Sequence, residues 1–130
     1  MKKLSISFLI FLFAQISLSQ ESNLLNAIQK ITYNNENVQV KAEFSKGEKQ
    51  FNEYVAENLK KAFGKNIEKQ FLVSFTVEID GTLSNIEIVK DTTSDIEDKI
   101  KSIILSSPKW LPAEHEGYRV KAKIKLNLKL

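Results

Sequence analysis

The stretch Tyr118–Leu130, which reads YRVKAKIKLNLKL, alternates apolar and polar side chains along its whole length. Because successive side chains of a β-strand point to opposite faces of a sheet, this pattern predicts a long strand with one buried face. The face expected in the core carries Tyr118, Val120, Ala122, Ile124, Leu126, Leu128 and Leu130. The other face carries the cations Arg119, Lys121, Lys123, Lys125 and Lys129, together with Asn127. This second face is free to meet solvent or an acidic partner.

A β-hairpin is predicted upstream of this strand. Phe71–Ile79 alternates in the same way, and Leu83–Val89 is a second run rich in apolar residues. The dipeptide Asp80–Gly81 between them is a strong signal for a tight turn. Within the second run, Ile86 and Ile88 are expected to face the core.

Two amphipathic helices are predicted, each opened by an S-x-x-E capping box, which satisfies free amide donors at a helix start. The boxes are Ser45–Glu48 and Ser94–Glu97. The apolar stripe of the first helix, about 16 residues long, consists of Phe51, Val55, Leu59 and Ala62 or Phe63. The stripe of the second consists of Ile96, Ile100, Ile103 and Ile104. Gly64 and Pro108 are expected to end the two helices.

The fold class follows from the order of these elements. Val38–Phe44 alternates over a shorter distance and adds a first strand, so the order is β-α-β-β-α-β. Both helical stripes are buried if the helices cover one face of an antiparallel sheet, which leaves the opposite face polar and wet. We therefore expect one α+β domain at residues 38–130. Gln20–Asn37 is a lead-in with helical spacing of its apolar residues.

Residues 1–19 have the pattern of a secretory signal peptide. Two lysines precede the mostly apolar segment Leu4–Leu18, and Ser17 and Ser19 are small residues suited to cleavage before Gln20. An uncleaved membrane anchor is the alternative, but the apolar stretch is shorter than the roughly 20 residues that span a bilayer. We expect export and a periplasmic location.

The composition excludes several classes of protein. With 42% apolar and 27% charged residues among 130, the chain is neither disordered nor of low complexity. It has no cysteine, so an exported domain of this kind must be held together by its core alone. The net charge is +3 and both signs are interspersed, which argues against a nucleic-acid partner.

The sequence carries few groups suited to catalysis. The single histidine, His115, lies between Glu114 and Glu116, and no further histidine or cysteine completes a metal site. Neither a G-x-S-x-G elbow nor a glycine-rich phosphate loop is present, and Asp80 is explained by the turn. We expect no catalytic, metal or cofactor site and no small-molecule substrate. A hydrolase or metal protein centred on His115 is the least favoured alternative.

Trp110 is the most suggestive single residue because it lies between Pro108 and Pro112. Such a tryptophan either pins a connector onto the core or presents an aromatic surface to a partner. The first interpretation is favoured, and the second is kept as an alternative.

Several of these motifs together resemble the C-terminal domain of TonB, as it occurs in stand-alone periplasmic relatives. The resemblance covers residues 38–130, and it is most specific around Trp110. The stretches that carry it are, in chain order, Ala42–Gly47 with the following helix, Val73–Gly81, Ile86–Val89, Ser106–Ala113 and Gly117–Val120.

The resemblance implies two helices against a three-stranded antiparallel sheet, and it implies a role. Domains of this family bind the N-terminal segment of an outer-membrane transporter and serve energy transduction in transmembrane transport. They bind by β-augmentation, in which a partner strand adds to a sheet edge. Here Tyr118–Leu128 would offer that edge, and the site residues would be Arg119, Lys121, Lys123, Lys125 and Trp110. The alternative is an exported structural protein that forms a dimer through the same strand.

Overall fold

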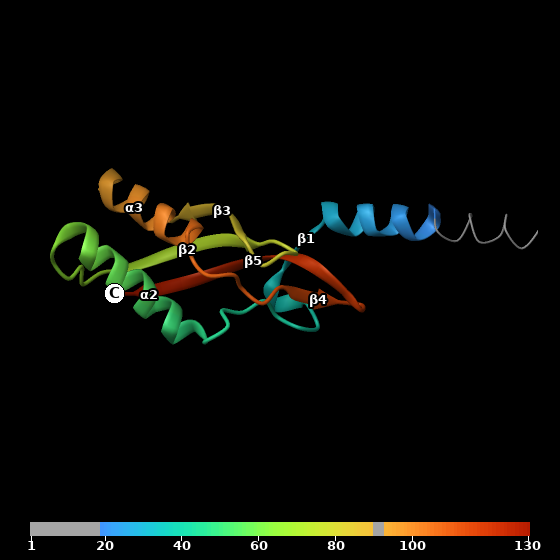
Figure 1. Ribbon diagram of the computed structural model, residues 1–130, viewed down its shortest axis with the longest axis horizontal. Helices are drawn as coiled ribbons and strands as arrows, with labels where there is room; N and C mark the ends of the chain where they lie inside the picture. Colours follow the sequence, from blue (N-terminus) through green and yellow to red (C-terminus); the bar gives the residue numbers. More distant parts are fainter. Residues whose placement is uncertain (1–18, 90–92) are drawn as a thin grey trace, which may run out of the picture. The chain divides into compact units, whose positions relative to one another are not determined.

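The computed structural model describes residues 19–89 and 93–130, and it divides the chain into two compact units, Met1–Ile31 and Thr32–Leu130 (Figure 1). In the first unit, residues 19–30 form a helix on which Leu24 and Leu25 are exposed, and Ile31, which follows the helix, is exposed as well. Almost all of the predicted signal peptide lies outside the described residues. None of the described helices combines the length and apolar character needed to cross a bilayer.

The second unit is built on a mixed sheet of five strands. The strands are β1 (Thr32–Asn34), β2 (Gln70–Val77), β3 (Leu83–Ile88), β4 (Ala113–His115) and β5 (Tyr118–Lys129). Their order in the sheet is β1-β5-β2-β3, and β4 also pairs with β5. The predicted α+β class is confirmed. The sheet is not the expected three-stranded antiparallel one, because β1 runs parallel to β5 and β4 adds a short antiparallel strand.

The segment Val38–Phe44 does not form the strand that its alternation predicted. It makes only isolated bridges, at Val40 with Glu114 and at Glu43 with Leu111. Val38, Ala42 and Phe44 are buried, as expected, but Val40 is 51% exposed. The reason is that the segment runs beside the short β4 and its preceding connector, where too few neighbouring residues lie in line for a continuous ladder.

The hairpin of β2 and β3 forms as predicted and contains a β-bulge. Ser74 pairs with Glu87 and Thr76 pairs with Ser84, so two residues of β3 lie opposite the single residue Phe75. One of the two, Asn85, has a positive φ of 50°. The bulge explains how Leu83 and Ile86 both face the core side although three positions separate them in the sequence.

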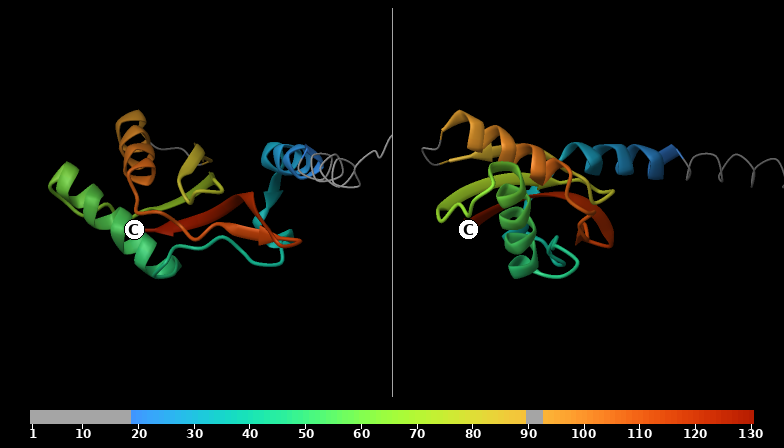
Figure 2. Two further views of the ribbon diagram at one scale, coloured as in Figure 1. Left: turned by 45° about the vertical axis from the view of Figure 1, so that its right-hand side comes forward. Right: turned by 60° about the vertical axis from the view of Figure 1, so that its left-hand side comes forward.

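The two predicted helices are α2 (Glu48–Phe63) and α3 (Ser94–Leu105), which lie side by side over the sheet (Figure 2). Their buried residues are Phe51, Val55, Leu59, Ile100, Ile103 and Ile104, all members of the predicted stripes, whereas Ile96 of the second stripe is only half-buried. Ala62 and Phe63 are exposed. The hydroxyl of Tyr54 joins the helices by donating to the carbonyl of Ile103 at 3.1 Å.

The predicted capping interactions were wrong for both helices. The N-cap of α2 is Gly47, with a φ of 86°, and the N-cap of α3 is Thr93; neither makes a side-chain capping hydrogen bond. Each helix therefore starts close to its predicted position without the predicted cap. The predicted end at Gly64 is confirmed, since this residue is left-handed and its N–H donates to the carbonyl of Lys60. α3 ends at Leu105, before Pro108.

An aromatic cluster fills the centre of the core. Trp110 is 5% exposed, and its ring lies 4.9 Å from that of Phe51 and 5.1 Å from that of Phe75, both edge-on. Phe44 completes the cluster at 5.6 Å from Trp110. The sequence favoured Trp110 as a core residue, and its burial agrees with that interpretation. The cluster joins the connector after α3 to α2 and to the sheet.

The face of the sheet opposite the helices is less exposed to solvent than expected. Ser74 and Thr76 of β2 belong to this face, yet they are only 2% and 4% exposed. In the register of the sheet Ser74 lies between Lys125 and Glu87, and Thr76 lies between Lys123 and Ser84. Long side chains thus flank Ser74 on both sides and Thr76 on the side of Lys123, and the stems of lysine and glutamate can lie along such a surface while their charges reach water.

The hairpin turn and the connector approach each other so closely that only glycine fits. Gly81 has a φ of 83°, and a Cβ there would lie 2.3 Å from the carbonyl oxygen of Trp110. The N–H of Trp110 also donates to the carbonyl of Gly81 at 2.9 Å.

We predict that Gly81→Ala lowers the free energy of unfolding by about 2–4 kcal/mol, because the new methyl group meets a fixed backbone oxygen. Gly117→Ala is the matched control, since Gly117 has a nearly equal φ of 81° but open space around it. Its cost should be only about 1 kcal/mol of backbone strain. Urea unfolding of both variants checks this, and equal losses would show that the close approach does not matter.

Candidate functional site

Strand β5 has one edge that is paired along its length. β2 pairs with Ala122–Lys129, and β4 pairs with Tyr118–Val120. Beyond the end of β2, the N–H of Leu130 donates to the carbonyl of Lys69 at 3.0 Å. Alternate residues of an antiparallel strand bond to the same neighbour, so the even-numbered residues of β5 bond to β2. The N–H and C=O groups of the odd-numbered residues therefore point to the opposite edge.

A second hydrogen bond supports this assignment. The N–H of Val89 donates to the carbonyl of Leu72 at 2.8 Å, which places the even-numbered backbone groups of β2 toward β3. Its odd-numbered groups then point to β5, and the register sets them opposite even-numbered residues, for example Val73 opposite Leu126. The hydrogen bonds of Leu130 and of Val89 therefore lead to the same direction for the backbone groups of β5.

The opposite edge of β5 is only partly occupied. β1 pairs there with Lys121–Lys123, and among residues 19–89 and 93–130 no strand continues beside Ile124–Lys129. The backbone groups of Lys125, Asn127 and Lys129 consequently point toward an edge without a paired strand. We call residues 124–129 the open edge. The sequence placed an available edge along all of Tyr118–Leu128, and the part of it at Lys121–Lys123 is in fact occupied by β1.

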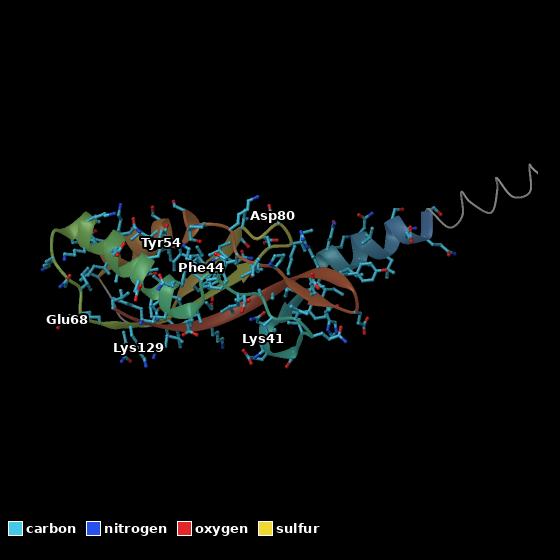
Figure 3. The ribbon with its side chains drawn as sticks, turned by 60° about the horizontal axis from the view of Figure 1, so that its bottom comes forward. Lys41, Phe44, Tyr54, Glu68, Asp80 and Lys129 are labelled. Carbon is cyan, nitrogen blue, oxygen red and sulfur yellow. The ribbon has the colours of Figure 1, made fainter. Side chains whose placement is uncertain are left out.

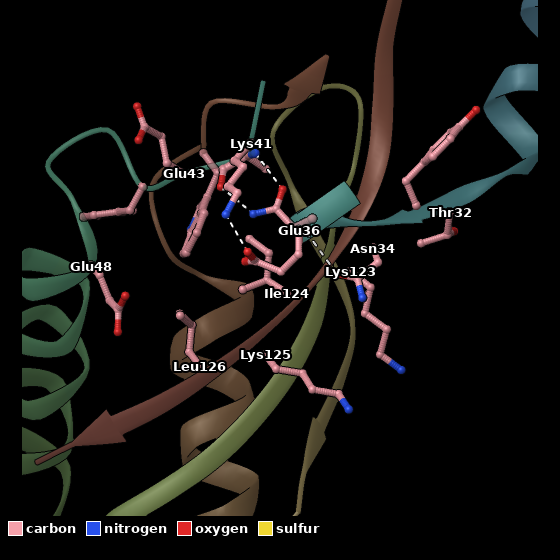
Figure 4. A pocket seen from close by; sticks show the side chains of 15 residues that line it. Thr32, Asn34, Glu36, Lys41, Glu43, Glu48, Lys123, Ile124, Lys125 and Leu126 are labelled. Carbon is pink, nitrogen blue, oxygen red and sulfur yellow. Dashed lines mark hydrogen bonds and ion pairs between the residues drawn. The ribbon is translucent and has the colours of Figure 1, made fainter. Parts of the chain in front are cut away.

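A hollow of about 760 Å³ lies beside the first part of the open edge (Figure 4). Ile124 and Leu126 point toward this hollow, whereas Lys123 and Lys125 point away from it (Figure 4). The remaining lining comes from β1 and the 3-10 helix η1 (Asn35–Asn37), from residues 41–44, and from Glu48 and Trp110. The buried part of the lining is mainly apolar, since Phe44, Trp110 and Ile124 are each at most 6% exposed.

One wall of the hollow is fixed by a buried asparagine. Asn35 is 8% exposed and makes two hydrogen bonds with Ala42: its Nδ2 donates to the carbonyl at 3.1 Å, and its Oδ1 accepts from the N–H at 2.7 Å. Next to this clamp, Lys41 pairs with Glu36. The segment between β1 and α2 is thereby held in one arrangement. The alternation of residues 38–44 does not indicate the two hydrogen bonds between Asn35 and Ala42, because they join residues on either side of a turn.

On the face of the sheet opposite the helices, some cations of β5 have a carboxylate nearby and others do not. Lys121 lies 3.6 Å from Glu78, and Arg119 lies opposite Glu114 in the register. Lys125 and Lys129 lie opposite Ser74 and Gln70, which are uncharged. Lys129 projects away from the domain (Figure 3). The two cations beside the open edge thus have no carboxylate directly across on β2.

The structure therefore divides the five residues proposed from the sequence. Lys123 and Lys125 border the open edge and the hollow, whereas Arg119 and Lys121 lie beside the occupied part of β5. Trp110 forms part of the wall of the hollow from within the core, and within the described part of the chain its Nε1 has no hydrogen-bond partner. Asn35, Phe44 and Glu48 belong to the site and were missed, because only the folded chain brings them beside β5.

The groups considered for catalysis do not gather in one place. His115 is half-buried, and its ring lies 5.2 Å from that of Tyr33. In the described ranges no three side chains of the metal-binding types lie close enough to hold an ion. Asp80 lies in the hairpin turn (Figure 3), where its Oδ1 accepts from the hydroxyl and the N–H of Thr82 at 2.6 and 3.0 Å. The absence of catalysis stays a prediction.

Comparisons with known proteins add no assignment: no family model matches the chain, and neither a curated protein nor a solved structure is detectably similar. The function has to be inferred from the geometry of the open edge and the hollow.

Hydrogen bonds from the side chain and then the backbone of Thr82 hold the pKa of Asp80 below its ordinary value. The ionised carboxylate is thus favoured in the folded state, so its stabilisation is present above the unfolded pKa and is lost as the pH falls through the folded pKa. We predict that Thr82→Val raises the pKa of Asp80, while Thr82→Ser keeps it low. An NMR titration of the Asp80 carboxyl group in both variants tests this prediction. Identical titrations would contradict the assignment of the lowered pKa to the hydrogen bond from the Thr82 side chain.

Proposed function

We propose that the protein is an exported binding module of the TonB C-terminal type, which recognises an extended peptide by β-augmentation in the periplasm. The observation that carries this proposal is the open edge, a run of unpaired strand backbone that borders a largely apolar hollow. Main-chain hydrogen bonds to such an edge give affinity, and the adjoining pockets give selectivity.

The backbone groups of the open edge supply enough hydrogen bonds for reversible binding. Lys125, Asn127 and Lys129 each offer one donor and one acceptor toward a partner strand. Each such bond contributes about 0.5–1.5 kcal/mol net, and burial of apolar side chains in the hollow adds to this. Part of this gain is offset by the ordering of the peptide, so we expect micromolar to millimolar affinity rather than a permanent complex.

The resemblance to TonB suggests which protein supplies the peptide. In that family the partner is the N-terminal segment of an outer-membrane transporter, and the same class of partner is our proposal here. It is supported by the position of the open edge on the strand that the resemblance singled out. It is also supported by the lysines along that strand, which favour an acidic segment.

Self-association is the second candidate, because two copies can in principle pair their open edges. In an antiparallel pair related by a two-fold axis, odd-numbered residues of one copy lie opposite odd-numbered residues of the other. If Asn127 lies on the axis, Lys125 of each copy faces Lys129 of its mate. Like charges directly opposite are destabilising, so the charge pattern favours a different partner over a second copy.

Proline at position 127 tests the proposed edge. The N–H of Asn127 points to the open edge and not to β2, so Asn127→Pro removes a donor for the partner while the ladder to β2 stays intact. Asn127→Ala is the matched control, because it removes the side chain and keeps the N–H. We predict that an N-terminal transporter peptide shifts the backbone amides of Lys125 and Lys129 in the wild type and in the alanine variant, and binds at least about tenfold more weakly to the proline variant.

Amide spectra must first show that both variants remain folded. Equal peptide binding by the proline and alanine variants would contradict the proposal. A protein that sediments as a dimer without peptide, and as a monomer after Asn127→Pro, would support the self-association candidate instead.

A further inference from the structure

We infer that the partner strand is short and two-faced, with acidic side chains at alternate positions beside Lys125 and Lys129 and apolar side chains between them in the hollow. This inference rests on the proposed function, and it adds what kind of peptide the site accepts. Three features of the described residues carry it: the end of β1, the cations of β5 and the lining of the hollow.

The end of β1 limits the length of the partner. β1 pairs with β5 as far as Asn34 opposite Lys123, and the chain then turns into η1. The hydrogen bonds between Asn35 and Ala42 hold this turn in place. A partner strand can therefore begin only beside Ile124, and the paired region of β5 ends at Lys129. The open edge has room for about six residues, or roughly 20 Å of extended chain.

One face of the partner must match the cations. Side chains of directly opposite residues have Cβ atoms about 4.5–5.5 Å apart on the same face of a sheet. The residues opposite Lys125 and Lys129 on β2 are Ser74 and Gln70, so neither cation is neutralised from that side. A partner strand on the open edge places its own side chains at the same distance on the other side of these lysines. Aspartate or glutamate at those positions is favoured, and lysine or arginine is repelled.

The other face of the partner must be apolar. Its side chains point to the same side as Ile124 and Leu126, which is the side of the hollow (Figure 4). There they meet a lining that includes Phe44 and Trp110. An acidic side chain in this position would lose water and approach Glu48, which also lines the hollow, and the nearby cation Lys41 is already paired with Glu36. The alternation of the partner thus mirrors the alternation of β5 itself.

The lysines have a simpler interpretation as guards that prevent indiscriminate pairing at a sheet edge. Guarding alone predicts that the total charge of a peptide matters and the order of its residues does not. A two-faced site predicts that peptides of the same composition bind with different affinity when the order of their residues differs. Peptides of identical composition separate these interpretations.

Three capped peptides serve as probes at low ionic strength, where charge effects are least screened. The first alternates glutamate and valine over six residues, the second has the same residues in two blocks, and the third alternates lysine and valine. Titrations follow the backbone amides of Lys125, Asn127 and Lys129 in the exported protein. We expect the alternating acidic peptide to bind about tenfold more tightly than the block peptide, and the lysine peptide not to bind.

Reversal of the charges provides the matched comparison. The double variant Lys125→Glu, Lys129→Glu should prefer the lysine peptide over the acidic one. The double variant Lys65→Glu, Lys99→Glu changes the net charge equally at exposed positions away from the open edge, and its preferences should equal those of the wild type. An alternating acidic peptide of nine residues should bind no more tightly than the one of six.

Each contrary result has a definite meaning. If the block peptide binds as tightly as the alternating one, or if both double variants behave alike, the two-faced recognition is overturned while the proposed function stands. If the nine-residue peptide binds more tightly and shifts the amides of Thr32–Asn34, β1 is displaced and the length limit is wrong. If no peptide shifts the amides of the open edge, including the transporter peptide, both the inference and the proposed function fail.

Discussion

The packing of Trp110 among Phe44, Phe51 and Phe75 is the contact on which the rest of the structure depends. The chain has no cysteine, so nothing covalent holds its distant segments together. The four rings come from the segment before α2, from α2, from β2 and from the connector after α3. Their contact fixes all four segments at once, and edge-on aromatic pairs add specificity to the area that they bury. Phe44 and Trp110 of this cluster also line the hollow, so the core and the candidate site share these two residues.

The elements with regular periodicity were predictable from the sequence, and those held by contacts between distant residues were not. β5, the hairpin and the buried residues of both helices followed from alternation and helical spacing. β1 has only three residues and its partner is almost ninety positions away in the chain, so no local pattern reveals a parallel pairing of this kind. Val38–Phe44 carried a pattern typical of a strand, but β4 is too short to extend it. The predicted caps failed for a different reason: the N-cap of α2 lies two residues after Ser45, and that of α3 lies one residue before Ser94, so neither serine occupies the capping position.

For the candidate site, the sequence pointed to β5, the strand that carries the open edge, and to an incomplete set of the residues around that edge. Lys123 and Lys125 were proposed from the alternation of the last strand together with the resemblance to TonB, and they do border the open edge. The limits of that edge depend on where β1 ends, and the hollow depends on how Asn35 holds Ala42. Both are properties of tertiary structure. Sequence periodicity shows which side chains share a face, but it does not show which edge of a strand a neighbour already occupies.

The β-bulge in β3 has a consequence for assembly. β3 is the other outer strand of the sheet, and Asn85, with its left-handed backbone, interrupts the regular spacing of donors and acceptors along it. A sheet with two regular edges can add strands at both sides and propagate into a filament. Here the irregular β3 lies at the opposite side of the sheet from the open edge. Strand pairing through the open edge therefore does not continue in register on the β3 side, which disfavours growth of a filament by repeated copies of the domain.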